Sequence, residues 1–531
     1  MTPDRASPYD VIVIGSGIGG LSAAALLSKL HQKRVLVLEQ HFVAGGLTHE
    51  FQRHGYHFDV GLHYVGAMGP GEPGRKLFDF LTDGTLAWNK MPPLFEKFIY
   101  PDFSFDVPSD PKEYLRSLQE KFPGEKEALA KYFKDCLKAA VWYGVETMVE
   151  TFPGLLRPLV ALAARLGGGI SRQTTKAYLD KNFKDDRLKS LLASQWGDYG
   201  LPPSQSAFGL HATIVEHYRK GGWYPVGGAV ELARKITPVI EASGGAVKVS
   251  QRVEEILVEE GRAVGVRVRP SNSSKGLPVE YRAQAVISDA GSYVTYSRLL
   301  KSAPAAYQEE LETLPKGLSA ISLYLGFKES PTKLGFKGEN YWVFEGEDHE
   351  SPNPELEKSG SYYLSFPSLK DPQSTGHTAE LIVFCEYDFF KKWSGQSWKR
   401  RDKDYYELKD RLTEHFLDLL DKRFPGFRNL VGYKELATPL TVEYFQQTPQ
   451  GSFYGIPGTP SRAGKPWARV TTPVKGLYLT GADVFSLGIM GAAMGGVKTA
   501  GMMSGPFGFL KVMEKIFRKK PLLVEVKPLR G

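Results

Sequence analysis

Apolar residues gather in short runs at both ends of the chain, and a pattern with helical spacing follows each run. Residues 9–14 (YDVIVI) are apolar and β-branched, as in a buried parallel strand. Helical spacing then continues to about Leu30, and a second apolar run follows at residues 34–39 (RVLVLE). Near the other end, residues 475–480 (KGLYLT) predict a strand and residues 497–503 a helix. The pattern predicts an α/β fold in which the two ends of the chain meet.

A glycine-rich turn joins the first predicted strand to the first helix. Gly15 permits a tight turn, Gly17 lets the backbone approach a pyrophosphate, and Gly20 lets the helix pack closely on the strand. The helix N-terminus offers amide groups to the phosphates. Glu39 ends the second strand, where a carboxylate can accept both ribose hydroxyls. An ordinary glycine-rich turn is the alternative, but this order of strand, turn, helix and acid predicts an NAD or FAD pocket rather than an NADP pocket.

The opposite end of the chain distinguishes between NAD and FAD. The strand at residues 475–480 leads into Gly481 and Asp483, and a helix then starts at Gly488 with small residues recurring every four positions. Small residues also suit plain helix packing. However, Asp483 can bond ribityl hydroxyls, and the helix N-terminus can face the flavin atoms that gain negative charge on reduction. The combination predicts FAD. Since no second glycine motif follows a strand, we expect an external electron donor, which is a small molecule, a protein partner or a quinone pool.

Further blocks of the chain resemble one family of flavoproteins. Residues 45–61 hold the paired glycines and the FDxG turn of the phytoene desaturase and carotenoid isomerase family, and residues 221–228 (GGWYPVGG) and 438–455 are similar to later segments of it. The variants GGLTHEF and FDVGLHYVG resemble its all-trans-retinol saturase branch. The resemblance covers most of the chain and implies that the backbone of Val253 lies against the adenine. Motifs and resemblance together predict the following cofactor-binding residues: Gly15, Gly17, Ile18, Gly19, Gly20, Glu39, Gln40, Gly45, Gly46, Leu47, Thr48, Val253, Gly481, Asp483, Gly488, Ile489, Met490, Gly491 and Ala492.

The positions of these blocks imply a discontinuous domain organisation. We expect a Rossmann-type FAD-binding domain, similar to that of glutathione reductase, with an inserted α+β substrate domain. The FAD-binding domain is predicted at residues 1–95, 222–300 and 466–505, the substrate domain at residues 96–221 and 301–465, and a basic amphipathic tail at residues 506–531. The polar stretch at residues 270–278 is interpreted as a hairpin loop inside the cofactor domain.

The resemblance implies that the substrate is a lipophilic polyene of the retinoid or carotenoid type. We expect FAD-dependent saturation of one carbon–carbon double bond. Desaturation or cis–trans isomerisation of a carotenoid on the same scaffold is the alternative. A different class of protein is also similar in fold: Rab escort proteins and GDP-dissociation inhibitors bind prenyl lipids without flavin chemistry. The intact glycines of the first turn and Asp483 argue against that class.

Saturation needs a proton as well as a hydride, so a proton donor is useful near the flavin. His63 and Tyr64 follow the FDxG turn and are the first candidates, with Tyr199, His211 and His217 as second choices. The alternative for any one of these histidines is a hydrogen-bonded scaffold residue. The other histidines near the first block lack the spacing of metal ligands, so no metal site is predicted.

Composition and charge narrow the setting of this 531-residue chain. With 42% hydrophobic and 24% charged residues it is ordinary for a folded protein, and Cys136 and Cys385 are too few for a disulfide scaffold. The first strand begins too early to leave room for a secretory signal, no apolar run is long enough to span a membrane, and no nucleic-acid motif accompanies the net charge of +8. We expect a peripheral or monotopic membrane protein on the cytoplasmic side.

Two segments are candidates for the membrane contact. Residues 509–520 combine basic and apolar residues, which suits either a solvated final helix or an anchor for anionic lipid. Residues 152–170 (FPGLLRPLVALAARLGGGI) are apolar with two arginines. They suit either a helix buried in the substrate domain or an entrance that dips into the membrane.

Overall fold

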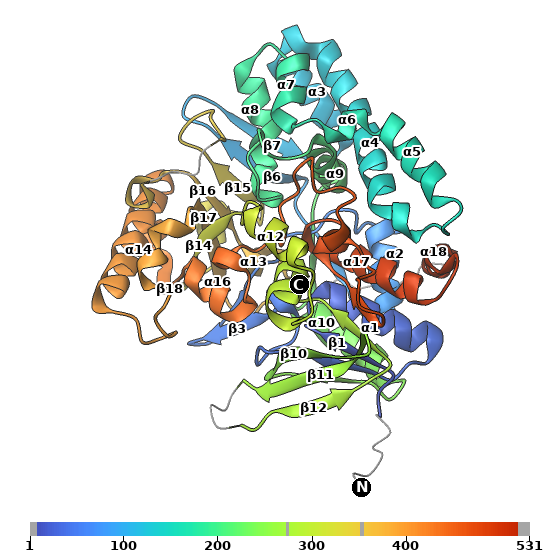
Figure 1. The fold of residues 1–531 in the computed structure, drawn as a ribbon. Coiled ribbons are helices and arrows are strands. Elements are labelled where there is room, and N and C mark those ends of the chain that lie inside the picture. The colour runs from blue at the N-terminus through green and yellow to red at the C-terminus, as the bar shows by residue number, and fades with distance from the viewer. Residues whose placement is uncertain (1–7, 272–275, 351–354, 519–531) are drawn as a thin grey trace.

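The computed structural model of the chain describes residues 8–271, 276–350 and 355–518. Residues 519–531 of the predicted basic tail, and part of the predicted loop at residues 270–278, lie outside the described residues. Figure 1 shows the described part of the chain as a parallel sheet near the N-terminus, a larger sheet beside it, and a layer of helices at the far side.

Five described strands form a parallel sheet that draws on both ends of the chain. Their order is β19 (Leu477–Leu479), β13 (Ala285–Ser288), β1 (Val11–Ile14), β2 (Val35–Leu38) and β9 (Ala246–Lys248). All four neighbouring pairs are parallel. The strands predicted at residues 9–14, 34–39 and 475–480 are therefore confirmed, and so is the closure of one chain end on the other.

Alternate side chains of the central strands enter two different cores, as a parallel sheet covered on both faces requires. Val11, Val13, Val35 and Val37 pack against α1 (Ile18–His31), α10 (Glu231–Glu241) and α17 (Gly488–Met503). Ile12, Ile14, Leu36 and Leu38 face an antiparallel sheet of β10 (Gln251–Glu259), β11 (Arg262–Pro270) and β12 (Val279–Arg282). The hairpin between β11 and β12 contains the stretch predicted as a hairpin loop.

Helices α1 and α17 approach each other closely because both present small residues. A Cβ atom on Gly496 would lie 2.6 Å from the carbonyl oxygen of Gly19 and 2.6 Å from Cβ of Ser22. A Cβ atom on Gly19 would lie 2.3 Å from Cα of Gly481, which precedes α17. The small-residue faces predicted for this helix are confirmed, and they bring the two helix N-termini together beside the parallel sheet.

The described residues also form a seven-stranded mixed sheet. Its order is β18 (Val431–Ala437), β14 (Ser319–Phe327), β17 (Thr378–Cys385), β16 (Tyr362–Ser365), β15 (Asn340–Val343), β6 (Leu94–Ile99) and β7 (Ser104–Pro108). β15 and β6 are parallel, and the other neighbours are antiparallel. Helix α14 (Lys403–Arg423) packs into the core on one face. Strands β3 (Glu50–Arg53) and β4 (Tyr56–Asp59) form a hairpin.

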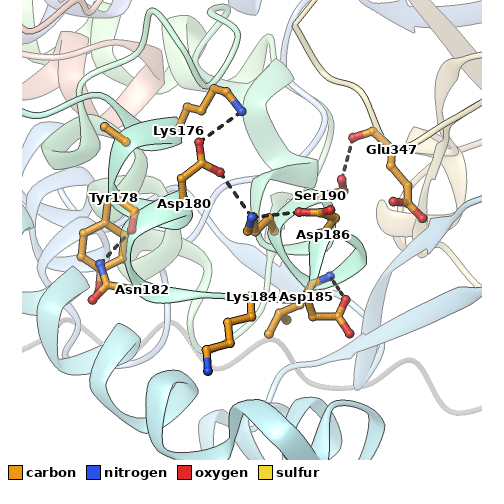
Figure 2. Close-up of polar contacts among 12 residues, drawn as sticks. Lys176, Tyr178, Asp180, Asn182, Lys184, Asp185, Asp186, Ser190 and Glu347 are labelled. Atoms are coloured by element: carbon orange, nitrogen blue, oxygen red, sulfur yellow. Dashed lines mark hydrogen bonds and ion pairs between the residues drawn. The ribbon is translucent and has the colours of Figure 1, made fainter.

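A helical layer completes the described fold. It contains α3 (Pro111–Lys121), α4 (Lys126–Met148), α7 (Thr175–Asn182), α8 (Asp186–Ala193) and α9 (Phe208–Tyr218). Figure 2 shows Asp180 at the end of α7 and Asp186 at the start of α8 pointing toward one another. Lys189 lies between them, 3.5 Å from Asp180 and 2.8 Å from Asp186, and Asp185 caps α8 by accepting the amide of Leu188 at 3.1 Å. These contacts join the end of α7 to the start of α8, and the short turn η4 (Ser194–Asp198) follows α8.

The two candidate membrane segments differ in what they do with their apolar residues. Helix α18 (Gly508–Arg518) buries Phe509, Val512 and Ile516 in the core shared with α2 (Pro73–Leu81) and α17. The interpretation of the tail as a lipid anchor is therefore corrected for its described part, because its main apolar face is already covered by protein.

Helix α5 (Arg157–Gly167) shows the opposite arrangement. Its leucines and those just before it are exposed, with exposed fractions of 93% for Leu155, 65% for Leu159 and 77% for Leu166. The interpretation of residues 152–170 as a buried helix is wrong. None of the helices within the described residues is long and apolar enough to cross a membrane.

Candidate active site

A large cavity lies between the parallel sheet and the seven-stranded sheet. Its volume is about 610 Å³, which is in the range of small-molecule sites. Two parts of its lining matter here. The glycine wall consists of Gly17, Ile18, Gly19, Gly45, Gly46, Leu47, Thr48, Asp483, Gly488, Ile489 and Ala492, and the aromatic wall of Tyr324, Trp342, Tyr363, Ile382, Phe384, Phe453 and Tyr454.

The glycine wall is built around the N-termini of α1 and α17. Gly17 and Leu487 precede these helices, and among the described side chains none caps either N-terminus. A Cβ atom on Gly46 would lie only 3.0 Å from Cα of Gly17, so the two glycine turns are in backbone contact. Uncapped N-terminal amides carry positive partial charge and suit an anionic ligand. The residues present therefore fit FAD, and the placement of the pyrophosphate at α1 and of the flavin ring at α17 remains a prediction.

Eleven of the predicted cofactor residues form the glycine wall, and the others lie outside the cavity lining. These others are Gly15, Gly20, Glu39, Gln40, Val253, Gly481, Met490 and Gly491. The buried carboxylate of Glu39 accepts the amide of Ser16 at 2.9 Å, the hydroxyl of Ser16 at 2.7 Å and the amide of His41 at 2.7 Å. Glu39 thus stabilises the glycine turn through hydrogen bonds without lining the cavity. Its contact with the ribose remains a prediction.

Asp483 is bound by backbone groups from two distant segments. One carboxylate oxygen accepts the amide of Ser292 at 2.6 Å, and the other accepts the amide of Ile456 at 2.9 Å. Since Asp483 also lines the cavity, it joins the loop after β13 to the loop before β19 at the cavity wall. Its predicted bond to the ribityl hydroxyls stays a prediction.

The motif analysis missed Asp289, which follows β13 and lines the cavity. A Cβ atom on Gly17 or on Gly19 would lie 2.5 Å from one of its carboxylate oxygens, so Asp289 sits directly on the glycine turn. Burial raises the pKa of Asp289 to about 8, opposed by a hydrogen bond from the amide of Gly20. The signal was the acid that ends the segment AQAVISD, because Glu39, Asp289 and Asp483 each follow a strand of the parallel sheet.

His63 lies at the cavity, but its surroundings keep it neutral. Its Nδ1 atom is 3.1 Å from a carboxylate oxygen of Glu380, although not aligned as a hydrogen bond. Burial, together with the nearby positive charge of Lys370, lowers the pKa of His63 to about 3. Lys370 donates to the carbonyl oxygen of His63 at 2.8 Å, to Ser365 at 2.6 Å and to Asn340 at 2.5 Å. A neutral imidazole in this network is a poor proton donor.

Of the five predicted proton donors, all within the described residues, only His63 lines the cavity. Tyr199 and His211 contact each other at 3.2 Å, and the other ring nitrogen of His211 is 2.7 Å from the hydroxyl of Tyr132. His217 accepts the amide of Gly66 at 2.8 Å. Burial lowers the pKa of His211 to about 3 and that of His217 to about 4. These three residues are corrected to scaffold positions, because their polar atoms are used inside the protein.

Tyr64 differs from these three residues because it does not line the cavity itself but forms a hydrogen bond to a residue that does. Its hydroxyl donates to the carboxylate of Asp198 at 2.6 Å, and Asp198 lines the cavity together with the aromatic wall. Asp198 was not among the predicted site residues. The only local signal was an acid in the segment QWGDYG, which follows α8.

Comparisons with known proteins agree with this geometry. The family model described as flavin containing amine oxidoreductase matches residues 18–503. An all-trans-retinol 13,14-reductase of Danio rerio is 33% identical over 519 residues, covering 92% of this chain and 84% of that protein. A chloroplastic prolycopene isomerase of Arabidopsis thaliana is 27% identical over 534 residues, covering 95% and 84%.

Among solved structures, putrescine oxidase bound to putrescine matches with a TM-score of 0.63 at 16% identity, covering 93% of this chain and 98% of that one. At that identity the likeness shows the fold alone. This likeness confirms the predicted Rossmann-type fold. The match to the flavin containing family confirms FAD as the cofactor.

Proposed function

Because this chain belongs to the flavin containing amine oxidoreductase family, and is thus an FAD-dependent oxidoreductase, we propose that it saturates a carbon–carbon double bond of a lipophilic polyene. The substrate class is a retinoid or a related carotenoid, and the reaction resembles conversion of all-trans-retinol to its 13,14-dihydro form. The observation that carries this proposal is the aromatic wall, which shares one cavity with the FAD-binding glycine wall.

The aromatic wall suits a flat conjugated chain. The wall offers ring faces and edges against which a conjugated chain can pack, from Trp342, Tyr363, Phe384, Phe453 and Tyr454. Desaturation or isomerisation of a carotenoid remains the second candidate, supported by the likeness to prolycopene isomerase. It is the weaker one, because the retinol reductase is more similar over nearly the same share of the chain.

When bound and reduced, FAD supplies a hydride for one carbon of the double bond. The glycine wall and Asp483 would hold the cofactor, and the aromatic wall would place the polyene beside it. An external electron donor completes the cycle.

The two walls support the predicted domain organisation. All residues of the glycine wall fall in the proposed FAD-binding domain (residues 1–95, 222–300 and 466–505). All residues of the aromatic wall fall in the proposed substrate domain (residues 96–221 and 301–465). The substrate would then bind between the two domains, as is common for small-molecule sites.

The reaction can be tested in a single turnover. The holoenzyme is reduced anaerobically, mixed with all-trans-retinol and then with carotenoids, and the products are analysed by mass spectrometry. We expect a product that has gained two hydrogen atoms, together with reoxidised flavin. A product that has lost two hydrogens from oxidised enzyme, or an isomer of unchanged mass, would instead support the second candidate. A protein without flavin absorption would support the class of prenyl-lipid carriers.

We also propose a peripheral membrane contact through α5, on the cytoplasmic side, where the free thiols of Cys136 and Cys385 stay reduced. Within the described residues, no protein surface covers the exposed leucines of α5 in the way that α2 and α17 cover α18. Fully burying a leucine contributes about 1.5–3 kcal/mol, so a few inserted leucines are enough for reversible binding. Arg157 and Arg165 on the same helix suit anionic headgroups.

This contact is tested with vesicles of phosphatidylcholine and phosphatidylserine. Replacing Leu155, Leu159 and Leu166 by serine should abolish cosedimentation while flavin content stays unchanged. Leu510→Ser is the matched control, because Leu510 is an exposed leucine on α18. Equal loss in the control, or no loss in the α5 variant, would contradict the assignment to α5.

A further inference from the structure

Two carboxyl groups are linked in the wall of the cavity. Asp198 lines the cavity, and Glu96 lies buried nearby. The hydroxyl of Tyr64 donates to Asp198 at 2.6 Å. Gln195 donates to Glu96 at 2.8 Å and also reaches the hydroxyl oxygen of Tyr64 at 3.4 Å. Trp342 of the aromatic wall donates its indole N–H to the other oxygen of Glu96 at 3.0 Å. Tyr64 and Gln195 therefore bridge the two acids.

Burial makes it costly for both acids to be ionised at once. It raises the pKa of Asp198 to about 7, opposed by the hydrogen bond from Tyr64. Burial and the charge of Asp198 raise the pKa of Glu96 to about 8. Two carboxyl groups in such an arrangement retain a shared proton near neutral pH.

The other titratable groups around this pair do not supply a competing proton. Tyr199, Tyr218, Tyr363 and Tyr454 interact with Asp198, and burial raises the pKa of each, so they stay neutral. Lys370 interacts with Glu96, and burial lowers its pKa to about 7. Its ammonium group donates to the carbonyl oxygen of His63, to Asn340 and to Ser365, and Lys370 is not part of the cavity lining.

We propose that Asp198 donates the proton that accompanies hydride transfer to the polyene, and that Tyr64 and Glu96 position and retain this proton. The proposal rests on the proposed function. In the step, a hydride adds to one carbon of the double bond and the π electrons take the proton of Asp198 at the other. The O–H bond of Asp198 breaks, a C–H bond forms, the polyene gains two electrons and the reduced cofactor loses them. Asp198 is left as a carboxylate and regains its proton from Glu96 or water.

Position favours Asp198 over the other acids at the cavity. Among the described residues that line it, Asp289 and Asp483 lie on or beside the glycine turns, and Glu435 is paired with Arg53 at 3.1 Å. Asp198 lies with the aromatic wall, where a polyene would bind. His63 also lines the cavity, but it is neutral with a pKa of about 3.

The first test needs no turnover. Infrared absorption of protonated carboxyl groups is recorded for the holoenzyme between pH 5 and pH 9. We expect a band that disappears with a midpoint near the pKa of about 7 and that is missing in Asp198→Asn. Asp186→Asn is the matched control, because Asp186 is exposed and an ion pair with Lys189 lowers its pKa. An unchanged titration in Asp198→Asn would overturn the proposal.

The pH dependence of the melting temperature Tm tests independently whether Asp198 is protonated near neutral pH. A carboxyl whose pKa is raised in the folded state stabilises the protein at low pH, and this stabilisation is lost as pH rises through the folded pKa. The Tm of the wild type should therefore fall between pH 5 and pH 8. The fall should be smaller in Asp198→Asn and unchanged in Asp186→Asn. An equal fall in both variants would contradict a shared proton at Asp198.

The second test measures transfer in a single turnover with all-trans-retinol. Asp198→Asn should keep FAD and retinol binding but reoxidise about 10²–10⁴-fold more slowly, the usual contribution of a positioned acid. Tyr64→Phe removes the bond that lowers the pKa of Asp198, so its rate should decline at higher pH than in the wild type. A loss below tenfold in Asp198→Asn would overturn the proposal, as would an effect confined to His63→Gln.

Failure of this proposal is distinguishable from failure of the proposed function. If the wild type reduces no polyene, both fall together. If the wild type turns over and Asp198→Asn matches it, only Asp198 is excluded. Should Asp198→Asn not fold, the pH profile of Tyr64→Phe decides the question, and an unshifted profile overturns the proposal.

Discussion

The glycine wall and the aromatic wall share one cavity but are built by different means. The glycine wall uses backbone: helix N-termini without a described side-chain cap, and two glycine turns so close that a Cβ atom on Gly46 would lie 3.0 Å from Cα of Gly17. The aromatic wall uses side chains from β14, β15, β16 and β17 and from the loop at Phe453 and Tyr454. Backbone approach depends on a few glycines that admit no side chain. A wall of rings depends on many residues, each of which contributes a part.

This difference predicts how each wall responds to substitution. A change at the glycine wall should affect cofactor binding and folding together, because the same backbone contacts serve both. A change at the aromatic wall should affect the polyene and leave FAD in place. Three substitutions test this separation.

The largest effect is expected for Glu39→Ala. Glu39 holds the amides of Ser16 and His41, and it is the predicted acceptor for the ribose. Loss of charge-assisted hydrogen bonds of about 1.5–3 kcal/mol weakens FAD binding by roughly 10- to 150-fold. The measurement is the Kd for FAD of the deflavinated protein. The matched control is Glu407→Ala, which removes an exposed ion pair with Lys403 on α14 and should leave the affinity unchanged. Full flavin content with unchanged affinity in Glu39→Ala would contradict the role of this carboxylate.

The next effect is expected for Gly19→Ala. Its Cβ would lie 2.3 Å from Cα of Gly481, and overpacking of this kind costs about 1–3 kcal/mol. Denaturant unfolding should show this loss of free energy of unfolding, and FAD binding should weaken as well. Gly144→Ala in α4 is the control, because its Cβ would meet only Cε of Met148 at 3.6 Å. That variant should gain about 0.5–1 kcal/mol from helix propensity. If both variants behave alike, close approach is not what builds the glycine wall.

The smallest effect is expected for Phe384→Ala at the aromatic wall. Loss of part of one ring contact, about 1.4 kcal/mol, should weaken retinol binding about tenfold, measured by quenching of tryptophan fluorescence. FAD content should stay unchanged. Phe507→Ala, an exposed phenylalanine near α18, is the control and should change neither. A loss of FAD in Phe384→Ala would show that the two walls are not separable.

The two candidate membrane segments show that a sequence pattern alone does not predict whether the apolar face of a helix is buried or exposed. Residues 152–170 and 509–518 both combine leucine-type side chains with arginine or lysine. In α18 the apolar side chains pack on α2 and α17, whereas in α5 they are exposed. Both helices have amphipathic sequences. They differ in that a neighbouring protein surface covers the apolar residues of α18, whereas those of α5 are exposed.

The sequence by itself determined the glycine wall, because its elements are local. A strand, a glycine turn and a helix follow one another in the chain, and the spacing of apolar residues with glycines at fixed offsets is enough to define them. The three acids that follow β2, β13 and β19 could be found in the same way, although Asp289 was overlooked.

Only the tertiary structure decided the roles around the aromatic wall. His63, His211 and His217 look alike in sequence, and burial and hydrogen-bond partners separate one at the cavity from two in the scaffold. Tyr64 and Asp198 are 134 positions apart, and Glu96 lies on a third segment. Whether two acids share a proton depends on the distance between them and on the loss of water around them. Neither quantity can be predicted from the local spacing of residues in the sequence. The backbone site follows from pattern, and the chemistry of the side-chain site follows from packing.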